Sequence, residues 1–118
     1  MTISFKASGI TLTEAIKAYG QDKIGSVASL LADQESANLD LELEKTTAHH
    51  QKGEVFRAEV NLRSMGELFR VEKTAEDLYV AIDLVRDDLI REVKNYKSRT
   101  ESIFKKGGRL AKRLLRMQ

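Results

Sequence analysis

Residues 74–106 carry the feature that most constrains the fold, a single stripe of mostly apolar side chains at helical spacing. The stripe falls within about 40° of one line on a helix of 100° per residue and consists of Leu78, Ile82, Val85, Leu89, Val93, Tyr96, Thr100 and Ile103. It predicts a helix of about 30 residues, roughly 45 Å long, capped by Thr74 and Asp77 and ended by Gly107 and Gly108. Such a stripe has to be buried against a second layer.

Segments with alternating apolar and polar residues supply that layer. Strict alternation over 38–45 (NLDLELEK) and 55–63 (VFRAEVNLR), followed by 68–73 (LFRVEK), predicts three strands that pair antiparallel. A polar loop at 46–53 and a tight turn at 64–67 join them. The start of the chain, TISFKA over residues 2–7, predicts a fourth strand with one buried face.

Residues 11–31 switch to helical spacing, with Thr11 and Glu14 as a predicted capping box. Gly20 and Gly25 lie inside this pattern, and each costs roughly 1 kcal/mol relative to alanine. The predicted order is therefore β-α-β-β-β-α. We predict an α+β two-layer sandwich, in which a four-stranded sheet carries both helices on one face and leaves the other face solvated.

Composition limits the possible classes of protein. The 118 residues suit one domain, and the absence of cysteine excludes disulfides and thiolate metal sites. No apolar run approaches the roughly 18 to 20 residues of a membrane span, and MTISFKASG does not resemble a signal peptide. We therefore expect a cytoplasmic protein that needs no membrane.

Nothing in the sequence predicts catalysis. It lacks a nucleotide-binding glycine loop, an H-E-x-x-H motif and a G-x-S-x-G motif. His49 and His50 are adjacent, so a regular strand cannot direct both to one metal ion. Asp87 and Asp88 point about 100° apart on a helix and are interpreted as solvated charges. We expect no enzyme activity, cofactor, metal or small-molecule substrate.

The charge distribution predicts a polyanionic partner. Residues 1–88 hold 10 Lys and Arg against 16 Asp and Glu, whereas residues 89–118 hold 10 Lys and Arg against 2 Glu. On the long predicted helix, one flank beside the apolar stripe carries Arg86, Arg91, Lys94, Lys97 and Lys105. A long, sparse ribbon of this kind suits the phosphates of a nucleic acid. The alternative is a lysine-rich helix surface that only keeps the protein dissolved.

The last residues extend the same positive charge. Residues 1–104 are predicted to form the α+β domain, and residues 105–118 a basic tail whose spacing is compatible with a short amphipathic helix. The tail contains Lys105, Lys106, Arg109, Lys112, Arg113 and Arg116. The aromatic residues that we considered lie on buried positions or at their edge, so reading of folded RNA by backbone and shape is favoured over base stacking.

One long motif supports this interpretation. The segment FRAEVNLRSMGELFRVEKTAEDLYVAIDLVRDDLIREVKNYKSR, with ITLTEAIKAY and LELEK before it, resembles the ribosome hibernation promoting factor and ribosome-associated inhibitor family, also called sigma-54 modulation proteins. The resemblance covers about residues 1–100. It implies a fold akin to double-stranded-RNA-binding domains and binding to small-subunit ribosomal RNA in the channel for tRNA and mRNA. It also implies inhibition of translation and preservation of idle ribosomes under stress or in stationary phase, without catalysis.

Individual residues match the basic positions of that family. Arg91, Lys94, Lys97 and Arg99 match its second helix, and Lys23 and, more loosely, Lys17 match its first. The chain departs from the pattern at Asp88, Asp22 and Ser26, where basic residues are common in the family. These changes weaken the expected RNA-binding face on its N-terminal side, and we infer that the basic tail compensates.

Two other functions fit the same residues. The amphipathic tail could dock on a protein partner or an anionic membrane surface, and the domain could bind other structured RNA. We expect the free protein to be monomeric.

Overall fold

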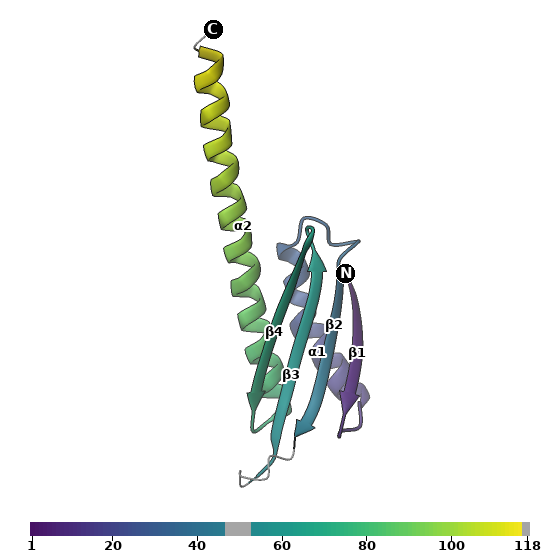
Figure 1. Cartoon of the computed structure of the whole chain (residues 1–118). Helices are drawn as coiled ribbons and strands as arrows, with labels where there is room; N and C mark the ends of the chain where they lie inside the picture. Colours follow the sequence, from purple (N-terminus) through teal and green to yellow (C-terminus); the bar gives the residue numbers. More distant parts are fainter. Residues whose placement is uncertain (47–52, 117–118) are drawn as a thin grey trace.

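The computed structural model describes residues 1–46 and 53–116, except for the side chains of residues 111, 112 and 114–116. Its elements follow the order β1 (Thr2–Ser8), α1 (Glu14–Gly25), the 3-10 helix η1 (Ser26–Leu30), β2 (Asn38–Thr46), β3 (Val55–Ser64), β4 (Glu67–Ala75) and α2 (Leu78–Arg116). Figure 1 shows both α-helices on one face of a single sheet. The predicted α+β architecture is therefore confirmed. His49 and His50 lie outside the described residues.

The sheet has the strand order β1-β2-β3-β4, with β1 parallel to β2 and the other pairs antiparallel. The register aligns Phe5, Leu41, Val60 and Val71 in one row across all four strands. Leu41 and Val60 are completely buried in this row. Because side chains alternate between the faces of a strand, this register places the apolar set of every strand against the helices.

Helix α1 approaches the sheet closely because Gly20 has no side chain. A Cβ atom at this position would lie 2.8 Å from Cε1 of Phe5 and 3.1 Å from Cδ2 of Leu41. Close packing of α1 on β1 and β2 thus accounts for a residue that is unfavourable in an isolated helix. Beyond Gly25 the chain tightens into η1, so the periodic segment 11–31 contains two consecutive helices rather than one.

The start of α1 differs from the prediction. The hydroxyl of Thr13 accepts a hydrogen bond from the backbone amide of Ile16 at 3.2 Å, so Thr13 is the N-cap. The predicted capping box of Thr11 and Glu14 is wrong, because Glu14 is the first helical residue and not the third. Thr13 stands two positions nearer to the helix than Thr11, so its hydroxyl can accept a hydrogen bond from a first-turn amide that has no partner within the helix.

The start of α2 is capped by Asp77 alone, without the other predicted residue, Thr74. Asp77 accepts hydrogen bonds from the amides of Tyr79 at 2.8 Å and Val80 at 3.2 Å. Thr74 still pairs with Arg57 inside the sheet and cannot act as the cap. A carboxylate at the N-terminus of a helix is additionally favoured by the helix dipole.

Helix α2 does not end at Gly107 and Gly108, and this part of the prediction is wrong. It continues as one helix of 39 residues to Arg116, a length of roughly 58 Å. Neither glycine adopts the left-handed backbone that ends many helices. Two glycines weaken a helix but, unlike proline, keep its hydrogen bonds, and the chain contains no proline.

The last turns of α2 project beyond the sheet, as Figure 1 shows. The stripe residues from Leu78 to Val93 are buried, whereas Ile103 is 70% exposed. The Cα radius of gyration is 18.8 Å, compared with about 13.5 Å for a compact chain of this length. We call residues 100–116 the helix extension.

The turn between β3 and β4 is fixed by Asp33, which lies in the segment between η1 and β2. Met65 (φ 54°) and Gly66 (φ 73°) both have left-handed backbone, as a two-residue hairpin turn requires. The carboxylate of Asp33 accepts hydrogen bonds from the Met65 amide at 2.9 Å and the Ser64 hydroxyl at 2.5 Å. These bonds, first that from Met65 and then that from Ser64, lower the pKa of Asp33.

Candidate nucleic-acid interface

The open face of the sheet is dominated by carboxylates arranged around one arginine. The Arg57 guanidinium contacts Glu42 at 3.0 Å, Glu44 at 2.7 Å and Glu59 at 2.6 Å, and its side chain is only 16% exposed. The hydrogen bond to Glu44 raises the pKa of Arg57, burial lowers it and the bond to Glu59 raises it, so the pKa is raised in total. Arg57 in turn lowers the pKa of Glu59. Because the protein's own acids neutralise this cation, the open face offers little attraction to a nucleic acid.

The first half of α2 also uses its cations internally. Arg86 pairs with Asp87 at 2.9 Å, and Asp88 bridges Arg91 and Lys73, the latter at 3.0 Å. Asp88 had been interpreted as a solvated charge, but its side chain is only 20% exposed. The bridge forms because a helical step of three residues brings Asp88 beside Arg91. Arg86 and Arg91 therefore contribute less free positive charge than the sequence suggests.

Of the two predicted cations of α1, only Lys23 lies beside a residue that contacts the long helix. Tyr19 of α1 donates a hydrogen bond to Asp83 of α2 at 2.7 Å, which raises the pKa of the tyrosine. Lys23 lies over the Tyr19 ring, with 5.6 Å from Nζ to the ring centroid, a cation–π contact. Lys17 forms only a long ion pair with Glu14, at 3.8 Å. Lys23 is thus tied to the junction of the two helices.

The second half of α2 is where unneutralised positive charge gathers. Besides Lys97, five exposed cations of this half have no ion pair within the part of the chain that the structure describes, namely Lys94, Arg99, Lys106, Arg109 and Arg113. Lys97 donates only to the backbone carbonyl of Leu30, at 2.8 Å, and Lys105 pairs with Glu101 at 3.5 Å. Residues 102–116 contain no acid at all. We call these seven cations the cationic strip.

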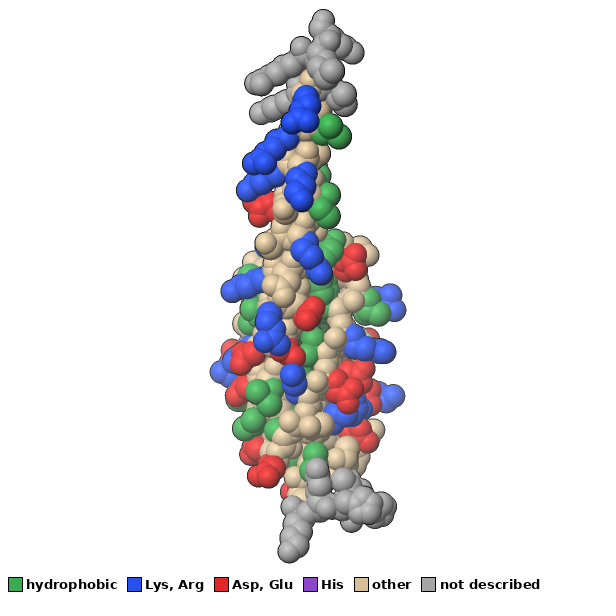
Figure 2. Space-filling view, turned by 60° about the vertical axis from the view of Figure 1, so that its left-hand side comes forward, with side chains coloured by type: hydrophobic (Ala, Val, Ile, Leu, Met, Phe, Trp, Pro, Cys, Tyr) green, Lys and Arg blue, Asp and Glu red, His purple; other side chains and the backbone are tan. Residues whose placement is uncertain are grey.

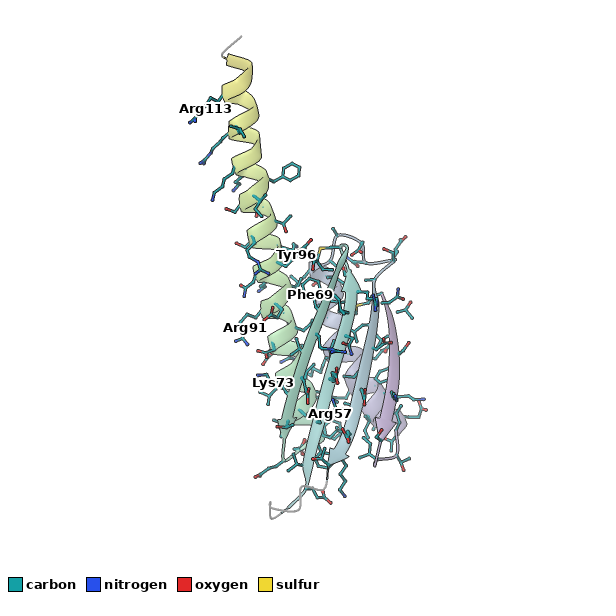
Figure 3. All side chains as sticks on the ribbon, in the orientation of Figure 1. Arg57, Phe69, Lys73, Arg91, Tyr96 and Arg113 are labelled. Atoms are coloured by element: carbon teal, nitrogen blue, oxygen red, sulfur yellow. The ribbon has the colours of Figure 1, made fainter. Side chains whose placement is uncertain are left out.

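The strip follows the part of the molecule that projects from the sheet. Figure 2 shows Lys and Arg side chains along the protruding end of α2, whereas most Asp and Glu side chains gather around the sheet. In Figure 3, Arg91 and Arg113 both point away from the sheet. Arg91, Lys94, Lys105 and Arg109 fall within about 60° of one another at 100° per residue. These four cations therefore share one outer side of α2, whereas Lys97, which donates to the Leu30 carbonyl, and Arg99 fall on opposite flanks of it. The side chains of Lys112 and Arg116 lie outside the description.

Phe104 is an exposed residue near these cations that the sequence analysis did not single out. It lies on the helix extension directly before Lys105 and Lys106, and 81% of it is exposed. An aromatic side chain beside two lysines in the sequence FKK is the signal that could have singled it out, since nucleic-acid surfaces combine the two types.

Residues 1–46 and 53–116 contain neither a helix able to span a membrane nor a cluster of metal-ligating side chains. No helix there combines the length and the apolar character of a membrane span. Nor does that part of the chain gather three His, Cys, Asp or Glu residues as a metal site would.

Comparison with known proteins identifies the class to which this fold and its basic helix belong. Residues 3–101 match the family of Sigma 54 modulation protein / S30EA ribosomal protein, and the chain belongs to this family. The resemblance predicted from the sequence is therefore confirmed. The family match ends at residue 101, so nearly all of the helix extension lies outside it.

Two relatives carry the same printed name. The chain is 30% identical over 96 residues to the ribosome hibernation promotion factor of Lactococcus lactis subsp. cremoris, covering 81% of this chain and 49% of the relative. It is 31% identical over 99 residues to the ribosome hibernation promotion factor of Staphylococcus aureus, covering 82% and 50%. The chain thus spans about half the length of the curated relatives it matches.

Solved structures agree with the fold. The N-terminal domain of Protein Y from Thermus thermophilus matches with a TM-score of 0.68 and 28% identity, over 81% of this chain and 99% of that domain. A ribosomal subunit interface protein from Coxiella burnetii matches with a TM-score of 0.67 over 83% of this chain and 99% of its own. At 15% identity, the second match shows the shared fold alone.

Proposed function

We propose that this protein is a non-catalytic ribosome-binding factor. It binds ribosomal RNA of the small subunit through phosphate contacts, occupies the channel for tRNA and mRNA, inhibits translation and preserves idle ribosomes in the cytoplasm under stress or in stationary phase. The observation that carries the proposal is the cationic strip on the outer side of α2. The names of the relatives support the ribosome as the polyanion.

The strip has the charge and the shape that phosphate binding needs. Its cations are spaced along a helix, and most of them form no ion pair that would have to break before they bind RNA. Neutralising phosphates releases condensed counterions, so this surface gives an affinity that falls steeply with salt. The open face of the sheet, whose cations and carboxylates pair with one another, adds little to this attraction.

The proposed RNA-contacting residues extend along both helices. Lys23 and Arg86 lie at the junction of α1 and α2, Lys17 lies near Glu14 on α1, and Arg91, Lys94, Lys97 and Arg99 follow on α2. The basic tail is proposed as a second unit beyond the domain of residues 1–104. It adds the basic side chains from Lys105 to Arg116. Because Arg86 and Arg91 share their charge with Asp87 and Asp88, we assign the larger contribution to the cationic strip.

Sedimentation through sucrose gradients tests the proposal. The protein is expected to comigrate with small subunits and whole ribosomes at low salt and to leave them at high salt. Bound protein should exclude tRNA and mRNA from small subunits, and unrelated duplex RNA should compete poorly. Protein that stays at the top of the gradient at every salt concentration contradicts the proposal.

A second function is favoured by the exposed apolar side chains of the helix extension. Ile103, Phe104 and Leu110 are all more than half exposed, so the basic amphipathic tail is also suited to a protein groove or an anionic membrane surface. Removal of residues 105–118 separates the two functions. The ribosome proposal expects weakened but surviving association with ribosomes, whereas a tail-only module loses all binding.

A further inference from the structure

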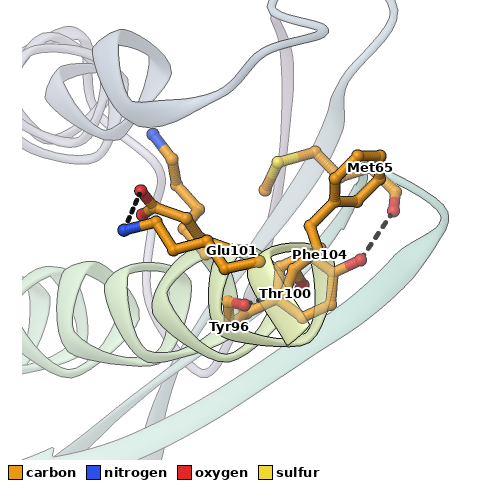
Figure 4. Close-up of a pocket in the computed structure, with 7 residues that line it drawn as sticks. Met65, Tyr96, Thr100, Glu101 and Phe104 are labelled. Carbon is orange, nitrogen blue, oxygen red and sulfur yellow. Dashed lines mark hydrogen bonds and ion pairs between the residues drawn. The ribbon is translucent and has the colours of Figure 1, made fainter. Parts of the chain in front are cut away.

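A groove lies at the elbow where α2 leaves the sheet, between the helix and the turn that joins β3 to β4. It is a cavity of about 540 Å³ whose lining includes Met65, Tyr96, Thr100 and Phe104, with Lys97 and Lys105 at its rim. Figure 4 shows these side chains converging from α2 and from the turn. We call it the elbow groove. Its volume falls in the range of roughly 300 to 1,000 Å³ that is typical of small-ligand sites.

One wall of the elbow groove is held in place before any ligand arrives. The Met65 amide donates to the Asp33 carboxylate at 2.9 Å, and the Met65 carbonyl accepts a hydrogen bond from the Tyr96 hydroxyl at 3.2 Å. The Tyr96 ring in turn packs edge-on against Phe69, with 5.5 Å between the ring centroids. Met65 is therefore anchored through its backbone on both sides, while its flexible thioether side chain remains able to adjust to a flat ring.

The opposite wall is an aromatic side chain that packs against little else. Phe104 is 81% exposed and stands about two turns beyond Tyr96, which contacts Met65 and Phe69. Exposure of a phenyl group of this size is unfavourable in water, and a ligand that covers it regains that free energy. A planar aromatic group suits the site best, because it can stack on the Phe104 ring and meet the Met65 sulfur at its edge.

The charge around the elbow groove narrows the choice of occupant. Lys97 and Lys105 stand at its rim. The nearby carboxylates are both engaged, that of Glu101 by Lys105 and that of Asp33 by the Met65 amide and the Ser64 hydroxyl. A second copy of this chain would bring another extension, whose only acid is Glu101, close to the first, and like charges would oppose the contact. An occupant that joins a planar aromatic ring to negative charge fits both the wall and the rim.

We propose that the elbow groove receives one unstacked nucleobase of the bound RNA. The base stacks on Phe104 opposite Met65, and the phosphates on either side of it lie at Lys97 and Lys105. This inference rests on the proposed function and adds to it a base contact on a surface that otherwise reads only phosphates. Stacking tolerates any base, so the groove selects an extruded nucleotide by its shape more than by its sequence.

Variants of Phe104 test the proposal on intact ribosomes. Replacing Phe104→Ala is expected to weaken ribosome binding roughly 10-fold, equivalent to about 1.4 kcal/mol, within the range reported for base–aromatic stacking. Phe104→Leu keeps an apolar side chain but loses the ring, so it should bind like the alanine variant, whereas Phe104→Trp should restore binding. Leu110→Ala is the matched control, because Leu110 is exposed on the same helix extension and does not line the groove.

Chemical probing of the ribosomal RNA bases supplies the direct readout. The wild-type protein should change the reactivity of an unpaired base, and the Phe104→Ala variant should leave that base as it is in free ribosomes. Circular dichroism of each variant checks that the fold is retained. If Phe104→Leu binds like the wild type, or if a photocrosslinker at position 104 reaches a ribosomal protein rather than RNA, the base-binding groove is refuted while ribosome binding stands. If the wild-type protein itself does not bind ribosomes, the proposed function fails and this inference fails with it.

Discussion

Neutralising a single lysine of the cationic strip should change how ribosome binding depends on salt. Six described cations of α2 have no carboxylate partner in the described chain, namely the five exposed ones and Lys97. If each contacts one phosphate, the slope of log K against log salt concentration is about −4 to −5.5. Affinity then falls roughly 300- to 2,000-fold between 50 and 200 mM salt.

The substitution Lys94→Gln removes one of these contacts. It should make the slope shallower by about 0.7 to 0.9, and at 0.1 M salt the lost counterion release corresponds to a roughly 5- to 8-fold weaker complex. The side chain is exposed and lies off the buried stripe, so the fold should be unaffected. Fluorescence titration of labelled protein with ribosomes at four or more salt concentrations measures both quantities.

Two control variants isolate the effect of position from the effect of net charge. Arg63→Gln makes the same change in net charge on the open face of the sheet, where Arg63 is exposed, and should alter affinity less than about twofold. Arg86→Gln removes a cation that is paired with Asp87 at 2.9 Å and should cost less than Lys94→Gln. Equal changes of slope for Lys94→Gln and Arg63→Gln would refute the reasoning, because binding would then follow total charge and not the strip.

Three further predictions concern the scaffold of this surface. Gly20→Ala should destabilise the fold by about 1 to 3 kcal/mol in urea unfolding, since the new Cβ would lie 2.8 Å from the Phe5 ring; an unchanged midpoint would show that α1 can move away. The lowered pKa of Asp33 stabilises the folded state above the ordinary carboxyl pKa of about 4, and this contribution is lost as pH falls through the lowered value. Asp33→Asn should therefore be less stable than the wild type at pH 7, with a difference that shrinks toward pH 2. The double variant Gly107→Ala and Gly108→Ala has open space for both methyl groups and should raise helix content by circular dichroism, since each change favours the helix by about 1 kcal/mol.

Local periodicity was sufficient to predict the layers of this fold. The alternation of Leu39, Leu41 and Leu43 and the helical stripe that begins at Leu78 each bury one face, and a sheet with both helices on one side covers both. A shift of one residue would turn these leucines to solvent, and the strand faces predicted to be inward are the buried ones. The errors fell at the ends of helices, where capping depends on the three-dimensional position of one side chain. Asp77 was recognised as part of a cap but not as the cap itself.

The pairing of charges could not be predicted in the same way. Helical spacing showed that Arg91 and Lys94 share one flank of α2, and the structure places them so. It did not show that Lys73 of β4 reaches across to Asp88, because that contact joins two elements whose relative position the sequence does not specify. For the same reason the elbow groove was missed, since Met65 and Phe104 come from separate elements that meet only in the folded chain.

The pairing of Asp88 changes where the binding surface has to lie. At a position where the resemblance leads us to expect a lysine, this chain has an acid that engages Arg91 and Lys73, so one substitution withdraws free charge from the first half of α2. The compensating cations stand in the second half and in the extension, beyond residue 101, where the family match ends. Continuation of α2 through Gly107 and Gly108 holds those cations on one rigid line with Lys94, which a separate disordered tail would not do. We therefore propose that the extension belongs to the same binding surface as the domain, and that its removal weakens ribosome binding by more than the single change Lys94→Gln.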